Sequence, residues 1–292
     1  MRTRPTLTWT ATGDPLPRTT SLTPLVDLLR PGRALVLSGA GLSTESGIPD
    51  YRGAEGSLRK HTPMTYQDFT ASAEDRRRYW ARAHVGWRAM RRAEPNDGHR
   101  AVAALQRAGL VDAVITQNVD GLHQDGGATD VVELHGSLHR VICLDCGATT
   151  DRAEHDARLH EANPGFTATA DRVNPDGDAD LPAEAVAGFR VVDCARCGGV
   201  LKPDVVFFGE NVPPERVRRC YDLVDAADTL LVLGSSLTVM SGLRFVRHAA
   251  KSGKPVAILN RGITRGDDRA AVRVDRELGQ ALGELVDLLG AR

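Results

Sequence analysis

The sequence has no hydrophobic run long enough to cross a membrane, and no charged and then apolar N-terminus of the kind that directs secretion. It also has almost no net charge, -1 at pH 7, so it offers little for general electrostatic binding to nucleic acid or to a membrane surface. We therefore predict a cytoplasmic protein of bacterial type with no direct nucleic acid partner and no membrane partner. In a eukaryote, the mitochondrial matrix would be the expected compartment.

Lysine is scarce as well: the 37 basic residues include only Lys60, Lys202, Lys251 and Lys254. We interpret this bias as the coding preference of a GC-rich source and assign it no chemical role. The chain has 292 residues, of which 41% are hydrophobic, and this is enough to bury a full core. One large domain with an insertion and a pair of domains are both compatible with this length.

Cysteine is rare, yet four of the five cysteines form two Cys-x-x-Cys pairs, Cys143 with Cys146 and Cys194 with Cys197. This spacing lets both thiolates of a pair bind one tetrahedral ion, so the pairs predict a zinc ribbon with one structural zinc. A redox role for paired thiols is the alternative. The stretch between the pairs exceeds the roughly 15 to 20 residues of the usual pattern, which predicts a loop insertion that includes 174–178.

The most informative stretch is 35–53, LVLSGAGLSTESGIPDYRG. A buried strand over 34–38 that ends in a glycine turn is typical of a nucleotide-binding βα unit. Its glycines, Gly39 and Gly41, would let backbone N–H groups approach a pyrophosphate. Thr44 stands where the third glycine of the dinucleotide motif belongs, so an ordinary strand-to-helix turn is the alternative.

Polar segments follow this turn and three later strands. They contain Asp50, Tyr51 and Arg52, then Gln117, Asn118 and Asp120, then Gly234, Ser235 and Ser236, and finally Asn260. Ligands of doubly wound sheets bind at the carboxyl ends of strands, so we expect these segments to share one site. In the segment 117–120, the hydrogen-bond acceptors of the carboxylate and amide side chains, together with the amide donors, suit a ribose and a carboxamide. For 117–120 the alternative is an Asx-rich turn that caps the next helix.

His135 ends a predicted strand over 131–134 and precedes a glycine that leaves room for a substrate. A lone histidine is more often structural than catalytic, and His139 competes for the role, but we prefer His135 as a base. The apolar segment 205–209 is expected to be either a plain core strand or a wall for an extended ligand.

Apolar periodicity predicts helices over 22–29, 75–92 and 96–107, and strands over 34–38, 112–116, 131–134, 229–234 and 255–260. The repeated order of strand, polar turn and helix indicates parallel pairing and an α/β fold. The loop 53–62 and the helix after it are expected to cover the site as a lid, and a solvated helix with an apolar seam is the alternative.

In their order along the chain, these motifs resemble those of sirtuins, the NAD-dependent protein deacylases. They are Gly-Ala-Gly41, Gly-Ile-Pro-Asp-Tyr-Arg52, Thr-Gln-Asn-Val-Asp120, His135-Gly136, the four cysteines, Phe-Phe-Gly-Glu210, Gly-Ser-Ser-Leu237 and Leu-Asn260. The resemblance covers about residues 25–290. Arg-Tyr-Trp-Ala-Arg82, the insertion with Asn-Pro-Asp-Gly-Asp178, and Leu-Asn-Arg-Gly-Ile-Thr-Arg-Gly-Asp-Asp268 are similar to the class II branch. That branch includes the animal mitochondrial sirtuin described as a lipoamidase, ADP-ribosyltransferase and deacylase.

The resemblance implies a Rossmann-like doubly wound parallel sheet with a smaller inserted module of helices and a zinc ribbon. It divides the chain into a flexible N-terminal tail, 1–23, and a catalytic domain, 24–292. Within that domain we expect the Rossmann part at 24–53, 96–142 and 203–292, the helical lid at 54–95, and the zinc ribbon with its insertion at 143–202.

The resemblance also implies roles for individual residues. His135 would be the general base, with Asn118 and Asp120 as further catalytic residues. NAD would contact Gly39, Ala40, Gly41, Ser43, Asp50, Tyr51, Arg52, Gln117, Asn118, Asp120, Gly234, Ser235, Ser236, Asn260, Arg261, Gly262 and Leu278. The acyl-lysine protein substrate would contact Tyr79, Arg82, Val205, Val206, Phe207, Phe208 and Gly209.

The implied activity is NAD-dependent deacylation of protein lysines, which consumes NAD and releases nicotinamide and O-acyl-ADP-ribose. The acyl-lysine carbonyl oxygen would attack the ribose carbon that carries nicotinamide, and His135 would then take a proton from a ribose hydroxyl. Protein mono-ADP-ribosyl transfer and lipoamide cleavage are the alternatives within the class. A zinc-ribbon module that binds nucleotide without catalysis is the alternative from a different class.

Tyr79 and Arg82 are three residues apart, so on a helix they share a face. A Tyr-x-x-Arg pair at this place resembles the carboxylate-binding pair of desuccinylating sirtuins. It predicts a preference for acidic acyl groups, such as succinyl or glutaryl, over acetyl. A solvated arginine beside a core tyrosine is the alternative.

Overall fold

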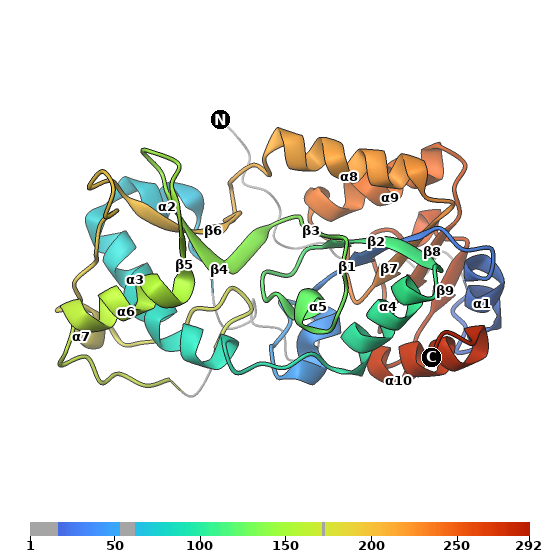
Figure 1. Cartoon of the computed structure of the whole chain (residues 1–292), viewed down its shortest axis with the longest axis horizontal. Helices are drawn as coiled ribbons and strands as arrows, with labels where there is room; N and C mark the ends of the chain where they lie inside the picture. Colours follow the sequence, from blue (N-terminus) through green and yellow to red (C-terminus); the bar gives the residue numbers. More distant parts are fainter. Residues whose placement is uncertain (1–16, 53–61, 171–172) are drawn as a thin grey trace.

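The computed structural model describes residues 17–52, 62–170 and 173–292. The chain forms a large part with a six-stranded sheet and a smaller part with a three-stranded sheet, which lie end to end along the long axis of the molecule (Figure 1). Most of the predicted tail, 1–16, and of the predicted lid loop, 53–61, falls outside the described ranges. No helix within those ranges is long and apolar enough to span a membrane.

The large sheet is parallel throughout and has the order β3-β2-β1-β7-β8-β9. Its strands are β1 (Ala34–Ser38), β2 (Val111–Thr116), β3 (Val131–Glu133), β7 (Thr229–Leu233), β8 (Val256–Leu259) and β9 (Val272–Val274). The chain order runs outward from the centre in both directions, so the topological switch point lies between β1 and β7. The predicted doubly wound α/β fold is therefore confirmed.

Helices cover both faces of this sheet (Figure 1). They are α1 (Thr23–Leu29), α4 (Asp97–Arg107), α5 (Leu122–Asp125), α8 (Pro214–Ala226), α9 (Met240–Lys251) and α10 (Leu278–Leu289). Val36 of β1 packs in one core with α1, α4 and α10, whereas Leu35 and Leu37 pack in the other with α8 and α9. Neighbouring strand residues thus serve opposite layers, which explains why β1 and β7 are buried along their whole length and nearly all apolar.

The smaller part has an antiparallel sheet in the order β5-β4-β6. Its elements are β4 (Gly136–Cys143), β5 (Thr149–Asp151), β6 (Leu201–Val205), α2 (Tyr66–Ala71), α3 (Ala73–Met90), α6 (Arg152–Ala162) and α7 (Ala183–Val186). The buried guanidinium of Arg152 lies 5.3 Å from the ring centroid of Trp80 and 5.2 Å from that of Trp87. Asp156 pairs with its charge at 3.2 Å. This cation–aromatic stack joins α6 to α3.

Several elements differ from the sequence predictions. The helix predicted over 75–92 begins at Ala73, and the separate α2 precedes it. Most of β4 and residues 203–205 of β6, which the domain prediction assigns to the Rossmann part, belong to the small sheet, where the two strands pair. β9 has no counterpart among the predicted strands, because its three residues include Arg273, whose buried charge is paired with Asp267 at 2.6 Å. Thr19, within the predicted tail, forms a parallel bridge to β9.

Candidate active site

A cavity of about 570 Å³ lies at the carboxyl ends of the parallel strands, with residues of both parts of the molecule in its lining. Loops that follow β1, β2, β7 and β8 form one side, and α3 with the segment after β6 forms the other. Its volume is that of a typical small-molecule site. Ligands of doubly wound sheets bind at this edge beside the switch point, so the cavity is the candidate active site.

Two glycine turns approach each other closely at the β1/β7 switch point. A Cβ at Gly39 would lie 2.8 Å from the Cβ of Ser235, and one at Gly41 would lie 2.8 Å from the carbonyl oxygen of Gly234. Gly234 has a φ of +60°, and a Cβ there would lie 2.6 Å from the backbone nitrogen of Leu42. Only glycine permits this approach of two backbones. The two turns therefore form a closely packed glycine cradle in the cavity lining, and the N–H of Gly41 donates to the carbonyl oxygen of Gly234 at 2.9 Å.

The polar segment after β2 is held by η1 (Ala40–Ser46), a short 3-10 helix that follows the first glycine turn. Ser43 donates a hydrogen bond to Asp120 at 2.7 Å, and the amide of Asn118 donates to Ser43 Oγ at 2.9 Å. Burial raises the pKa of Asp120, while the hydrogen bonds from Ser43 and from the first N–H of α5 act in the opposite direction. Asp120 thus caps the start of α5, as the alternative interpretation expects, and it also lines the cavity.

His135 lines the cavity just before β4. Its Nδ1 lies 2.9 Å from the carbonyl oxygen of Gln117, and because a carbonyl only accepts, Nδ1 carries the proton of the neutral ring. Nε2 then accepts from the hydroxyl of Ser241, 2.8 Å away. Burial, with the charges of Arg216 and Arg244, lowers the pKa of His135 to about 4. At neutral pH the ring is a neutral base whose accepting nitrogen faces another lining residue.

His139, the competing histidine, does not belong to the cavity lining that the described residues form. Its Nε2 lies 2.9 Å from the backbone oxygen of Asp120, and its ring packs edge-on against Trp87 with centroids 5.3 Å apart. These contacts join β4 to α3 and to the loop after β2. They are the contacts of a structural residue.

Aromatic rings form the cavity wall on the side of the small part. Tyr79 of α3 packs against Phe207 with ring centroids 5.2 Å apart and against Phe69 of α2 at 5.4 Å. Tyr51 packs edge-on against Phe208 at 5.9 Å. Tyr51, Tyr79, Phe207 and Phe208 line the cavity. This end is therefore more apolar than the end at the glycine cradle.

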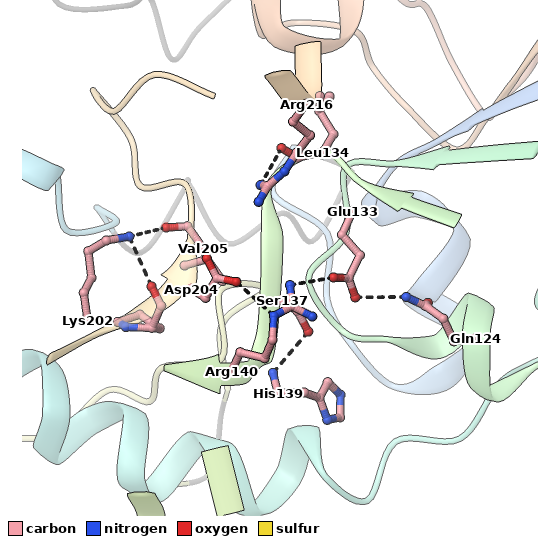
Figure 2. A network of polar contacts seen from close by, with 11 residues as sticks. Gln124, Glu133, Leu134, Ser137, His139, Arg140, Lys202, Asp204, Val205 and Arg216 are labelled. Atoms are coloured by element: carbon pink, nitrogen blue, oxygen red, sulfur yellow. Dashed lines mark hydrogen bonds and ion pairs between the residues drawn. The ribbon is translucent and has the colours of Figure 1, made fainter. Parts of the chain in front are cut away.

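A polar network joins β3 of the large sheet to β4 and β6 of the small sheet, as Figure 2 shows. Arg140 of β4 donates to Asp204 of β6 at 2.9 Å and to Glu133 of β3 at 2.7 Å. Glu133 also accepts from Gln124 of α5 at 2.9 Å. Since His135 lies between β3 and β4, these charge-assisted bonds hold the strand ends on either side of it.

Lys202 orders the cavity wall that follows β6. Its buried ammonium donates to the carbonyl oxygens of Pro203 at 3.1 Å and of Val205 at 2.5 Å (Figure 2), and it pairs with Glu210 at 3.2 Å. Glu210 in turn accepts from the N–H of Phe207 at 2.8 Å. The segment between these residues is therefore closed into a fixed turn, and its side chains line the cavity.

The four cysteines lie together in the small part, with their sulfur atoms within 4.8 Å of one another. Cys143 Sγ is 3.6 Å from Cys197 Sγ, and Cys146 Sγ is 3.9 Å from Cys194 Sγ. Metal–sulfur bonds of about 2.3 Å in a tetrahedron separate the sulfurs by roughly 3.8 Å, so this donor set fits one zinc ion. None of the four belongs to the described cavity lining, which agrees with a structural metal.

Nearly all residues predicted for the site line the cavity. Within the described ranges, the exceptions among the predicted cofactor and substrate residues are Leu278 and Arg82. Leu278 begins α10 and belongs to the core, where it packs below Gly234. Arg82 forms ion pairs with Asp178 at 3.2 Å and with Asp180 at 2.6 Å, both in the insertion between the cysteine pairs.

Ser241, Arg244 and Asp176 line the cavity without a predicted role. Ser241 and Arg244 belong to α9, whose sequence is that of an ordinary amphipathic helix. Asp176 lies within the stretch 174–178, which the sequence marks as part of a loop insertion and as similar to the class II branch, without a place in the site. The order of the motifs gives no sign that these segments reach the site, because tertiary packing alone brings them there.

A protein-family model described as "Sir2 family" matches residues 39–241. A relative from Streptomyces coelicolor, "NAD-dependent protein deacetylase 1", is 66% identical over 292 residues, which are 100% of this chain and 98% of the relative. A relative of the same name from Mycobacterium avium is 55% identical over 270 residues, 91% of this chain and 94% of the relative.

Solved structures share the architecture. One described as "Sir2-p53 peptide-NAD+" has a TM-score of 0.74 at 30% identity and covers 93% of this chain and 100% of that chain. Another, "Structural Basis for the Mechanism and Regulation of Sir2 Enzymes", has a TM-score of 0.71 at 31% identity and covers 91% of this chain and 96% of that chain. The similarity thus extends over both parts of the molecule.

Proposed function

The chain belongs to the Sir2 family and is an NAD-dependent protein deacetylase. We propose which part of the cavity binds each of the two substrates. NAD binds from the glycine cradle to His135, and the acetyl-lysine side chain enters along the aromatic wall. His135 stands where the two meet. The observation that carries this proposal is a neutral, partly buried histidine in a cavity with the glycine cradle at one end and aromatic rings at the other.

The glycine cradle fits the pyrophosphate of NAD. Its backbones approach so closely that a Cβ at Gly39, Gly41 or Gly234 would lie within 3 Å of neighbouring atoms. The N–H groups of these glycines donate to carbonyl oxygens of their own chain, so the phosphates would bind to neighbouring lining groups, the N–H of Ala40 and the hydroxyls of Ser235 and Ser236. The segment 260–262 after β8 would hold the adenosine ribose, and Asp50, Tyr51 and Arg52 would enclose the nicotinamide. When bound, NAD supplies the ribose carbon from which nicotinamide departs.

His135 is proposed to take the proton of a ribose hydroxyl at Nε2. Its Nδ1–H stays on the carbonyl oxygen of Gln117, which keeps the ring orientation and leaves the other nitrogen as the acceptor. The Ser241 hydroxyl, which now donates to Nε2, would yield that position to the ribose hydroxyl. Asn118 and Asp120, locked through Ser43, would position the ribose without rearranging.

The acyl-lysine protein substrate is proposed to contact Tyr79 and the segment 205–209. A solved relative is described as a complex with a p53 peptide, and an extended peptide binds such a segment through main-chain hydrogen bonds. That Arg82 holds the carboxylate of an acidic acyl group stays a prediction. For this role its guanidinium would have to exchange its ion pairs with Asp178 and Asp180 for the substrate.

Membership of the class II branch is a finer proposal. Two of the stretches that carry this resemblance, 78–82 and 174–178, contact each other through the ion pair of Arg82 with Asp178. A change in one stretch would therefore disturb the other, which is a physical reason for the two to occur together.

Incubation of the protein with NAD and an acetyl-lysine peptide, followed by mass spectrometry, tests the proposed function. Deacetylation gives nicotinamide, free lysine peptide and O-acetyl-ADP-ribose in equal amounts. Mono-ADP-ribosyl transfer would instead give labelled protein without free lysine, and a lipoyl-lysine peptide in place of the acetylated one tests lipoamide cleavage. Two outcomes would contradict the proposed binding sites within the cavity. One is nicotinamide release in the absence of any peptide, and the other is no nicotinamide release with any of the peptides.

A further inference from the structure

The insertion between the cysteine pairs contains a tight turn, 174–178. The N–H of Asn174 donates to the carbonyl oxygen of Asp178 at 2.8 Å, and the Asn174 side-chain amide donates to the Asp178 carboxylate at 2.6 Å. The N–H of Gly177 donates to the carbonyl oxygen of Asn174 at 2.9 Å, and Gly177 has a φ of +75°, which favours glycine. The turn is therefore closed by its own hydrogen bonds.

The turn is also fixed against α3. A Cβ at Gly86 would lie 2.4 Å from the carbonyl oxygen of Gly177. Because glycine has no side chain, the turn can pack directly against the backbone of α3 at this position. One helical turn earlier, Arg82 pairs with Asp178 at 3.2 Å and Asp180 at 2.6 Å, and it donates to the backbone oxygen between them at 2.8 Å. The guanidinium that the sequence assigns to an acyl carboxylate binds carboxylates of its own chain.

This arrangement carries Asp176 into the cavity lining, where it lies close enough to Tyr51 and Tyr79 to act on their charges. Its Oδ1 atom is buried and has no hydrogen-bond partner within the described ranges. The lining thus includes a carboxyl group with one oxygen closed off from solvent and without a compensating partner within the described ranges. A ligand that brings a further carboxylate would meet an uncompensated like group.

The surroundings of Asp176 disfavour negative charge in general. Burial, and after it the charge of Asp178, raises the pKa of Asp176 well above its usual value. Burial, and after it the charge of Asp176, likewise raises the pKa values of Tyr51 and Tyr79, and these causes outweigh the charges of Arg52 and Arg152, which act in the opposite direction. Since these acids resist ionisation for the same reasons, a carboxylate carried by a substrate would pay the same penalty at this place.

We propose that Asp176 is a specificity-determining residue that excludes acyl groups ending in a carboxylate and admits neutral ones. The inference rests on the proposed function, in which the acyl group enters beside Tyr79. Arg82 is then a positioning residue, which acts by holding the turn that carries Asp176. A neutral acyl chain packs against the aromatic wall without desolvating a charge, whereas a succinyl chain would bring its carboxylate to the part of the lining that contains the Asp176 carboxyl group.

The test compares butyryl-lysine and succinyl-lysine in one peptide, because these acyl groups have the same number of carbons and differ in the terminal carboxylate. The readout is kcat/KM at saturating NAD for wild type, Asp176→Asn, Asp176→Ser and Asp180→Asn. We expect the wild type to favour butyryl, and both Asp176 variants to raise the succinyl-to-butyryl ratio on the order of tenfold. Asp180→Asn keeps an oxygen that can accept from Arg82, removes a carboxylate next to the same turn from outside the described cavity lining, and should leave the ratio unchanged.

A wild-type preference for succinyl, or an unchanged ratio in both Asp176 variants, overturns the inference. An equal rise in Asp180→Asn also overturns it, since the effect would then come from net charge and not from the cavity residue. Arg82→Met separates the two accounts of that residue: the carboxylate-binding prediction requires a selective loss of succinyl turnover, whereas our inference requires that the ratio does not fall. Absence of nicotinamide release with every peptide would refute the proposed function, while deacylation with an unchanged ratio refutes only the role of Asp176.

Discussion

Several histidines of this protein are held neutral by burial. Burial is the largest cause that lowers the pKa of His99 and of His135 to about 4, and that of His123 and of His155 to about 3. A histidine in the unfolded chain has a pKa of about 6.5 and therefore binds a proton first as the pH falls. The stability contributed by these neutral rings is fully present above that value and is lost as the pH drops toward the native pKa values.

His155 gives the clearest test of this pH-dependent contribution to stability. Its ring packs on Trp80 with centroids 4.3 Å apart, and within the described ranges neither ring nitrogen has a hydrogen-bond partner. His155→Phe removes the titrating group, so it should abolish about 2 kcal/mol of the stability that the wild type loses between pH 7 and pH 5. Urea denaturation at both pH values measures the difference. Equal losses in the two proteins would contradict the shifted pKa.

Single residues also show how far the sequence predicts the site. Gly39, Asn118 and Gly234 directly follow apolar strands, so the local pattern is enough to assign them to one edge of a parallel sheet. Ser241 reaches His135 from a helix more than a hundred residues later, with an Oγ to Nε2 distance of 2.8 Å and a sequence separation of 106. Asp176 arrives from an insertion. No local pattern encodes contacts of this kind.

Among the elements, the predicted strands are those with long apolar runs buried on both faces, such as β1 and β7. β9 is short, and its central Arg273 carries a buried charge that pairs with Asp267 at 2.6 Å. The pairing of β6 with β4 joins segments on opposite sides of the zinc ribbon. The sequence therefore predicts strands whose residues are apolar and buried on both faces. It misses strands and strand pairings that depend on contacts with a distant segment.

The glycine cradle is the element on which NAD binding is proposed to depend. Gly234→Ala should weaken NAD binding and folding more than Gly109→Ala. Both positions have positive φ, +60° and +72°, so both variants share the roughly 1 kcal/mol cost of placing an alanine in that conformation. At Gly234 the new Cβ would lie 2.6 Å from Leu42 N, whereas at Gly109 no described atom lies within 4 Å. Forcing the two turns apart should add about 1–3 kcal/mol.

Calorimetric titration with NAD and urea denaturation of both variants separate these costs. Gly109→Ala supplies the effect of conformation alone, far from the cavity. Equal changes in stability and in NAD affinity for the two variants would show that the close approach of the turns has no energetic consequence.

At the scale of the whole molecule, the cavity exists only because the small part is held against the large one (Figure 1). Arg140 bridges the two sheets through Glu133 and Asp204. The small part has a core of its own, which includes Trp80 and two of the four cysteines. The metal site of the small part therefore affects the shape of the active site, although none of its four cysteines belongs to the described cavity lining.

We expect one tightly bound zinc per chain, and we expect Cys194→Ser to lose both zinc and solubility. With only three thiolates left, the tetrahedral set is incomplete and the small part loses a cross-link between its two cysteine pairs. Cys220→Ala is the matched control, because Cys220 is buried in the large part away from the cluster. Atomic absorption and thermal denaturation measure the outcome, and normal zinc content with normal folding in Cys194→Ser would refute the zinc ribbon.

Whether His135 is the base of this NAD-dependent deacetylase is tested most directly by comparing His135→Ala with His139→Ala. The measurement is kcat for an acetyl-lysine peptide at saturating NAD, with NAD binding followed by calorimetry. Loss of a general base costs about 10²- to 10⁴-fold, so His135→Ala should lose at least that lower factor while it still binds NAD. His139→Ala, altered outside the described cavity lining, should keep its turnover per folded molecule. Wild-type kcat in His135→Ala, or an equal loss in His139→Ala, would show that His135 is not the general base.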